Sequence, residues 1–97
     1  MIKLIRIRES EKPLKKYDAV LMVNGIERVV SFGAKGYEDF TTHGDEERKK
    51  RYLLRHKSRE DWTKSGVLTP GFYSRWVLWN LPTIQGSVKD LKSRFGL

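Results

Sequence analysis

Cysteine is absent from this 97-residue sequence, and its apolar runs are short. Without cysteine there can be no disulfide, no thiolate metal ligand and no cysteine nucleophile, so stability must come from packing and hydrogen bonds. Charged residues or asparagine interrupt every apolar run well before the ~20 residues that span a bilayer. The first ten residues, MIKLIRIRES, alternate charged with apolar side chains. We therefore expect a strand there, and neither a signal peptide nor a transmembrane helix.

Negative charge is also scarce, because 12 acidic residues stand against 20 lysines and arginines and leave a net charge of +8. A positive field of this size attracts phosphates, anionic lipids or acidic proteins. A chain of this length, 38% hydrophobic, has room for one modest core. The sequence therefore predicts a single basic domain over residues 1–97, with a β-meander in 1–33 and a helical part in 45–97.

Three β-branched runs, 2–8, 17–23 and 26–32, predict three strands in the first third of the chain. Asn24-Gly25 lies between the second and third runs, and this dipeptide favours the type I′ turn of an antiparallel hairpin. The second run is apolar on both faces, which is typical of a central strand. In the third run the face that carries Ile26, Val30 and Phe32 is expected to be largely buried.

Helical patterns fill the rest of the chain. Residues 45–57 begin with acids and end with bases, which complements a helix dipole, and Leu54 is expected to widen a narrow apolar stripe. Phe72, Trp76 and Trp79 recur at helical spacing, and Thr83 is placed to cap a last helix after Pro82. The predicted fold class is α+β: a three-stranded antiparallel meander followed by two or three packed helices.

The most basic stretch is 48–59, which we expect to be a helix with seven cations in twelve residues. They are Arg48, Lys49, Lys50, Arg51, Arg55, Lys57 and Arg59. Such a cluster can bind nucleic acid by displacing condensed counterions. It can equally be a solvated helix face relieved by Glu46–Lys50 and Glu47–Arg51 pairs, or a surface for acidic protein or lipid.

Five aromatic residues are candidates for a core or an interface: Trp62, Phe72, Tyr73, Trp76 and Trp79. Aromatic side chains can stack on bases, lie at a membrane interface or anchor a protein interface. Burial of Phe72, Trp76 and Trp79 is the simpler expectation, because a small domain needs large side chains to fill its interior. The sequence neighbours of Trp62 are polar, so burial is less strongly predicted for Trp62 than for the other aromatic residues.

No pattern of residues indicates catalysis. His43 and His56 lack the spacing of a zinc site and have no cysteine to complete one, so capping or surface roles are expected for them. FGAKG departs from both phosphate-loop and dinucleotide patterns, and a tight turn explains its two glycines. We expect no catalytic residue, metal, cofactor or small-molecule substrate.

From Ser31 onward the sequence resembles a short uncharacterised family of nucleocytoplasmic large DNA viruses, including those of algae and amoebae. The resemblance is carried by SFGAKGYEDFTTHGD, RKKRYLLRH, EDW and TPGFYSRWVLWNLPTIQGSVKDLKSRF. It covers about two-thirds of the chain, and the first thirty residues match only in their hairpin character. No activity and no catalytic residue can be carried over from this family.

The resemblance implies a viral protein that is made in the host cytoplasm and located in the virion. The leading hypothesis is a non-enzymatic minor capsid protein that binds acidic neighbouring capsid subunits or the inner membrane surface. The alternative is a nucleic-acid-binding protein that uses the basic segment 48–59. The two alternatives predict different partners for the same positive charge.

Overall fold

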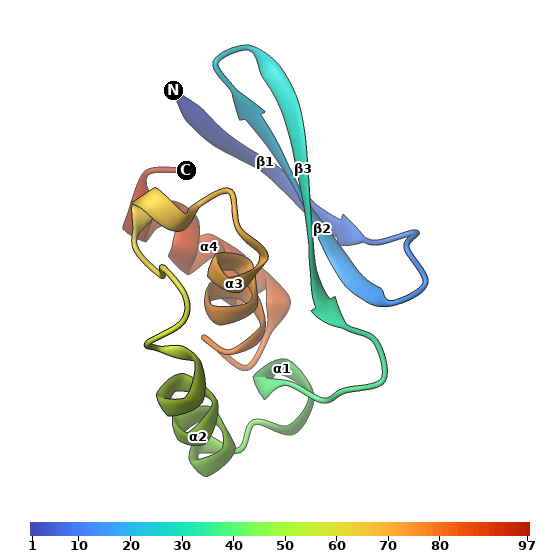
Figure 1. The fold of residues 1–97 in the computed structure, drawn as a ribbon, viewed down its shortest axis with the longest axis vertical. Coiled ribbons are helices and arrows are strands. Elements are labelled where there is room, and N and C mark those ends of the chain that lie inside the picture. The colour runs from blue at the N-terminus through green and yellow to red at the C-terminus, as the bar shows by residue number, and fades with distance from the viewer.

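A computed structural model describes all residues, 1–97, as a three-stranded antiparallel meander followed by helices (Figure 1). The strands are β1 (Ile2–Glu9), β2 (Lys15–Val23) and β3 (Ile26–Ala34), in the order β1-β2-β3. The other elements are α1 (Phe40–His43), α2 (Glu46–His56), the 3-10 turn η1 (Lys64–Gly66), α3 (Pro70–Tyr73), the π-helix η2 (Ser74–Leu78) and α4 (Ile84–Phe95). The predicted α+β class and the central position of the second strand are confirmed.

The β2–β3 hairpin turns at the predicted dipeptide. Asn24 and Gly25 have φ angles of 51° and 84°, the two positive values that a type I′ turn requires. On the other side of β2, the pairing of β1 shifts between Leu4 and Arg6. This bulge inserts one residue, so that Leu4, paired with Leu21, and Ile7, paired with Ala19, lie on the same core-facing side of the sheet.

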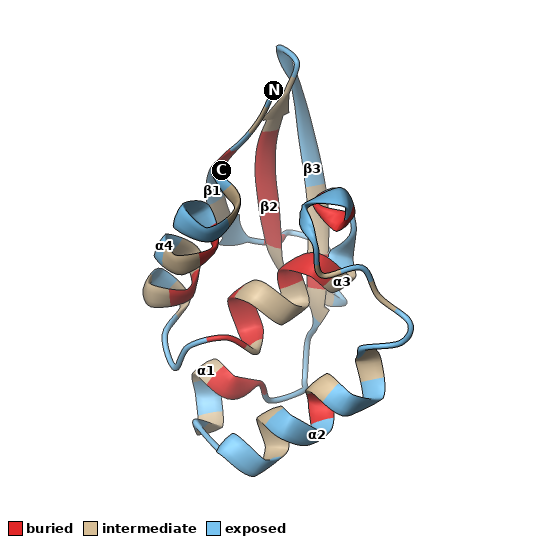
Figure 2. Cartoon of the chain, turned by 90° about the vertical axis from the view of Figure 1, so that its left-hand side faces the viewer, coloured by how far each residue is buried: buried red, intermediate tan, exposed pale blue.

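The core lies between one face of the sheet and the C-terminal helices (Figure 2). Leu4, Ala19, Leu21 and Phe32 come from the sheet, and they join a buried cluster whose helical members include Phe72, Tyr73, Val77 and Leu91. The hairpin tip projects beyond the helices in both views.

This projection corrects the expectation for β3. Its turn-proximal half is exposed, and Ile26 keeps 66% of its surface accessible. Burial on that face begins at Val30, which is half-buried, and is complete at Phe32. The alternating pattern therefore predicted the direction of each side chain, but not how far along the strand the helices reach.

Helix α2 begins and ends close to the predicted limits. The Asp45 side chain caps it by accepting hydrogen bonds from the backbone N–H groups of Glu47 and Arg48. The helix ends at His56, so Lys57 and Arg59 lie beyond it and the prediction of one helix over 48–59 is corrected. Leu54 is 77% exposed, so it does not widen the apolar stripe.

The segment that follows Pro70 departs from an ordinary α-helix. After α3, the backbone widens into the π-helix η2, where the N–H of Trp79 donates to the carbonyl of Ser74 at 3.1 Å. The extra residue in this turn changes which side chains point inward, so that Val77 and Leu78 are buried. Trp76 and Trp79 are partly buried and pack against the core cluster.

The last helix, α4, is capped as predicted. The Thr83 hydroxyl accepts a hydrogen bond from the backbone N–H of Gly86 at 3.0 Å. Leu91 is fully buried, and Ile84, Val88 and Phe95 pack against the core from the same helix. None of the helices has the length and apolar character needed to cross a bilayer.

Candidate functional site

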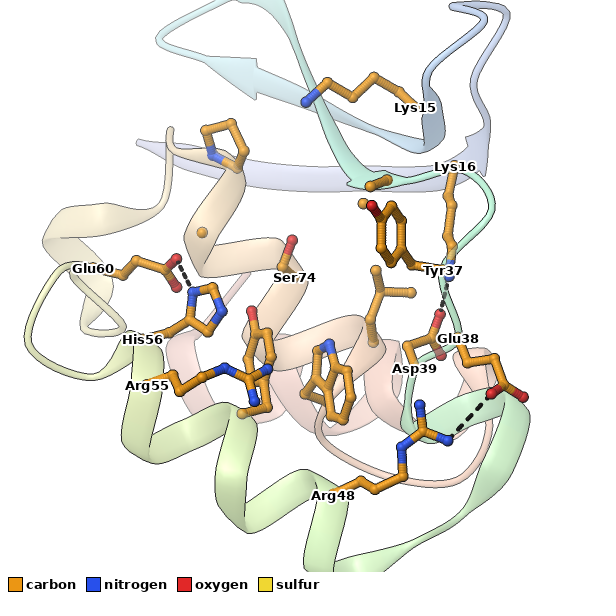
Figure 3. Close-up of a pocket in the computed structure, with 17 residues that line it drawn as sticks. Lys15, Lys16, Tyr37, Glu38, Asp39, Arg48, Arg55, His56, Glu60 and Ser74 are labelled. Atoms are coloured by element: carbon orange, nitrogen blue, oxygen red, sulfur yellow. Dashed lines mark hydrogen bonds and ion pairs between the residues drawn. The ribbon is translucent and has the colours of Figure 1, made fainter.

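A cleft of about 560 Å³ opens between the end of the sheet and helix α2 (Figure 3). Its walls come from the start of β2 and end of β3 on one side and from α2 on the other, and α3 and η2 contribute its floor. Three floor residues, Ser74, Leu78 and Trp79, belong to the π-turn or immediately follow it. π-Bulges occur frequently at functional sites, and here the widened turn helps to shape the cleft.

A column of stacked rings forms one wall of the cleft. The Tyr52 ring lies parallel to Trp79, with centroids 4.3 Å apart and planes 5° apart, and His56 stacks on Tyr52 at 4.2 Å. His43 packs on Trp79 at 5.4 Å. Burial raises the pKa of the Tyr52 hydroxyl, and the nearby Glu60 carboxylate adds to this effect. The column therefore fixes α2 against η2, and Tyr52 stays neutral.

Each carboxylate that lines the cleft is paired with a basic side chain of the same cleft. Lys16 Nζ lies 2.6 Å from Asp39, and Arg48 lies 3.2 Å from Glu38. His56 Nδ1 lies 2.8 Å from Glu60.

Two cations of the cleft have no acidic partner. They are Lys15 on the sheet side and Arg55 on α2, and neither forms an ion pair. These two unpaired cations can therefore attract a negatively charged ligand.

Glu60 connects α2 to the start of α3 at the edge of the cleft. One carboxylate oxygen accepts from Trp62 Nε1 at 3.0 Å, and the other lies 2.8 Å from His56 Nδ1. A Cβ atom added at Gly71 would lie 2.9 Å from Glu60 Cδ, which is closer than real Cβ contacts come. Glycine at this position thus allows the carboxylate to lie against the helix.

The seven cations of segment 48–59 do not share one surface. Lys49 points inward, where its Nζ donates to the carbonyl of Asn80 at 2.7 Å and lies 4.8 Å from the Phe40 ring centroid. Burial lowers the pKa of Lys49, and the positive charge of Arg75 contributes. Arg48 is engaged by Glu38.

Five cations of the segment remain exposed and without an ion pair: Lys50, Arg51, Arg55, Lys57 and Arg59. The Glu46–Lys50 and Glu47–Arg51 pairs of the solvated-face alternative do not form in the structure. The positive charge of this surface is therefore not relieved within the helix.

Most of the predicted aromatic candidates are engaged inside the protein. Phe72 and Tyr73 are fully buried. Trp62 and Trp76 flank Arg75, whose guanidinium carbon lies 5.6 Å and 4.2 Å from their ring centroids. Trp76 Nε1 also donates to the carbonyl of Trp62 at 2.9 Å. These contacts explain the partial burial of Trp62 without any ligand.

The structure does not bring the two histidines together. His43 and His56 lie at opposite ends of the ring column, with Tyr52 and Trp79 between them. His43 Nδ1 accepts a hydrogen bond from the backbone N–H of Asp45 at 2.9 Å, in agreement with a capping role. No group of three or more acidic or histidine side chains is arranged to hold a metal ion.

The sequence reasoning missed the cleft residues that come from outside segment 48–59. Lys15, Lys16, Tyr37 and Asp39 all line the cleft, and Tyr37 is 74% exposed. Only Asp39 had a recognisable local signal, because Asp39 and Thr42 have the spacing of a capping box, which the structure shows at α1. The pairing of Asp39 with Lys16 joins segments far apart in the sequence and has no such signal.

The fold and this site define a small basic α+β domain with a polar, positively charged cleft. Residues 5–56 match the model of a protein family described as Family of unknown function (DUF5754), and the chain belongs to this family. The match extends from within β1 to the last residue of α2. No curated protein and no solved structure matches the chain.

Proposed function

We propose that this protein is a non-enzymatic structural protein of a virus particle, a minor capsid protein that binds acidic neighbouring subunits or the inner membrane surface. The observation that carries this proposal is the excess of unpaired positive charge. Of the 20 lysines and arginines, only Arg8, Lys16, Arg48 and Arg94 form ion pairs, which leaves sixteen without a carboxylate partner. Unpaired charge of one sign favours a partner of the opposite sign.

The positions of these cations favour several neighbours over one. Lys3 and Arg6 are exposed on β1, and the strand register places them on the sheet face that does not pack on the helices. Lys50 is exposed on α2, and Lys89 and Lys92 are exposed on α4. A small protein with charge on several sides is suited to wedge between acidic subunits.

The viral source is supported by the resemblance to a family of nucleocytoplasmic large DNA viruses. A capsid protein of such a virus is made in the host cytoplasm and ends in the virion. Quantitative mass spectrometry of purified particles tests this proposal. We expect the chain in amounts comparable to other minor capsid proteins, and its absence from the particles would overturn the structural role.

The second candidate is a nucleic-acid-binding protein, and the five exposed cations of segment 48–59 favour it. Proteins that bind single strands usually add aromatic side chains on which bases stack. Phe72 and Tyr73 are buried here and cannot stack on bases, so phosphate contacts would supply most of the binding. A salt titration of binding to an oligonucleotide tests this candidate, because phosphate binding must weaken steeply with salt. No binding at low ionic strength would reject it.

A further inference from the structure

We propose that the cleft between the sheet and α2 binds an acidic peptide segment of the partner protein, in which acidic residues alternate with apolar ones. This inference rests on the proposed function, because it names the part of the acidic partner that this surface recognises. Three features of the cleft support it: two cations without an acidic partner, a small apolar surface between them, and a lining in which polar residues outnumber hydrophobic ones.

The leftover charge determines the sign of the ligand. Asp39 and Glu38 are neutralised by Lys16 and Arg48 within the cleft, and Glu60 is held by hydrogen bonds with His56 and Trp62. Lys15 and Arg55 have no such partner and come from opposite walls, as Figure 3 shows. A ligand that carries two separate negative charges can therefore pair with a cation on each wall.

The floor determines what lies between the two charges. Trp79, which is half-buried, and Tyr37, which is 74% exposed, provide apolar surface in the lining, whereas Leu78 is buried. Successive side chains of an extended peptide point in opposite directions. An apolar side chain can therefore contact this floor while the carboxylates on either side of it turn toward Lys15 and Arg55.

The lining distinguishes a peptide from other ligands. Only five of the 17 lining residues are hydrophobic, whereas pockets for small organic ligands are lined mainly by apolar side chains. A nucleic-acid strand would need exposed ring faces for its bases. Tyr52 and Trp79 instead stack on each other and on the two histidines, so Tyr37 alone among the lining rings is exposed. Charge complementarity with an apolar floor thus favours an acidic peptide.

The test uses the full chain and a fluorescent eight-residue peptide of alternating glutamate and leucine, with fluorescence anisotropy at low ionic strength. Lys15→Glu and Arg55→Glu are expected to weaken binding by about tenfold each, because each places a carboxylate against the ligand. Arg51→Glu and Lys50→Glu are matched controls, since both residues are exposed and unpaired on α2 but do not line the cleft. We expect the controls to change the Kd by less than about threefold.

A second readout does not depend on the variants. In two-dimensional amide NMR spectra of the wild-type chain, the peptide is expected to shift the Gly33 and Gly71 amides and the Trp79 indole, which line the cleft. The Gly25 amide, at the hairpin tip and outside the cleft, serves as the reference. A peptide with glutamine in place of glutamate should bind at least about tenfold more weakly.

Three results would overturn the inference. Equal weakening by the cleft and control variants would show that acidic ligands bind all over the surface, and the proposed function would survive without the cleft. If the peptide does not bind at low ionic strength, the cleft is not a peptide site. The structural role is tested separately, by mass spectrometry of particles. Displacement of the peptide by a lower concentration of oligo-thymidylate would assign the cleft to nucleic acid.

Discussion

The Tyr73 side chain is fully buried against Phe32 and Phe72, and its hydroxyl has no hydrogen-bond partner. Burial raises the pKa of this hydroxyl, so it stays neutral. A buried polar atom without a partner costs free energy, and its removal eliminates that cost. We therefore expect Tyr73→Phe to raise the free energy of unfolding by about 1 kcal/mol in urea denaturation. A loss of stability would show that the hydroxyl is satisfied in solution.

Asp18 is the residue whose protonation should matter most for the sheet. Its carboxylate lies on β2, accepts a hydrogen bond from Ser31 at 2.7 Å and pairs with Arg8 at 3.3 Å. Burial works to raise the pKa of Asp18, but hydrogen bonds from Ser31, Ser10 and Arg8 outweigh it and lower the pKa below its usual value. The folded protein therefore holds the charged form more tightly than the unfolded chain does.

This lowered pKa fixes the direction of the pH dependence. The Asp18 carboxylate contributes its full stabilisation above about pH 4, the pKa of an aspartate in the unfolded chain. This contribution is lost as the pH falls through the lower pKa of Asp18 in the folded protein. We expect Asp18→Asn to lower the free energy of unfolding at pH 7 by about 1.5–3 kcal/mol, and the difference from wild type to shrink below about pH 4.

Glu11→Gln, on an exposed residue without an ion pair, is the control for Asp18→Asn. Urea denaturation across the acid range measures all three proteins. A stability difference between wild type and Asp18→Asn that does not change with pH would contradict the role given to this carboxylate.

At the scale of the elements, the junction of α2 and α3 depends on Gly71. A methyl group there would collide with Glu60, which is held by His56 and Trp62. We expect Gly71→Ala to cost about 1–3 kcal/mol, as overpacking does.

A double-mutant cycle isolates the collision of Gly71→Ala with the Glu60 carboxylate. In the Glu60→Ala background the same substitution should cost much less, because the carboxylate it would meet is gone. Thermal unfolding of the four proteins measures this coupling. Strictly additive costs would show that Gly71 is required for another reason.

The elements that could be predicted from the sequence have local causes. The turn at Asn24-Gly25 depends on two adjacent residues, and the cap at Thr83 depends on a backbone N–H group three residues away. Strand alternation likewise predicted that Phe32 faces the core. Each of these signals is complete within a few residues, so no knowledge of the rest of the fold is needed.

The features that could not be predicted depend on packing between distant segments. Helical periodicity assumes 3.6 residues per turn, so it did not predict the widened turn at Ser74 or the complete burial of Val77 there. Lys49 was expected on a basic surface, yet it finds the carbonyl of Asn80, 31 positions away. The cleft has the same origin, because Lys15 and Arg55 line it from different elements.

At the scale of the whole molecule, the net charge of +8 should destabilise the folded state through self-repulsion. Salt screens this repulsion, since the Debye length falls to about 10 Å at 0.1 M ionic strength. We expect the Tm to rise when sodium chloride is added. The double variant Lys50→Glu, Arg51→Glu lowers the net charge by four, so its Tm should rise less. A Tm that falls with moderate salt would contradict net repulsion in the folded chain.

The unpaired lysines also allow the most direct test of the proposed role as a capsid protein. A carbodiimide joins a lysine to a carboxylate only when the two are in contact, so it records acidic partners in intact particles. Exposed lysines lie on the sheet, α2 and α4, among them Lys3, Lys50 and Lys89. The predicted result is cross-links from at least two of these elements to carboxylates of capsid proteins. Particles that contain the protein but yield no such cross-links would contradict the proposal.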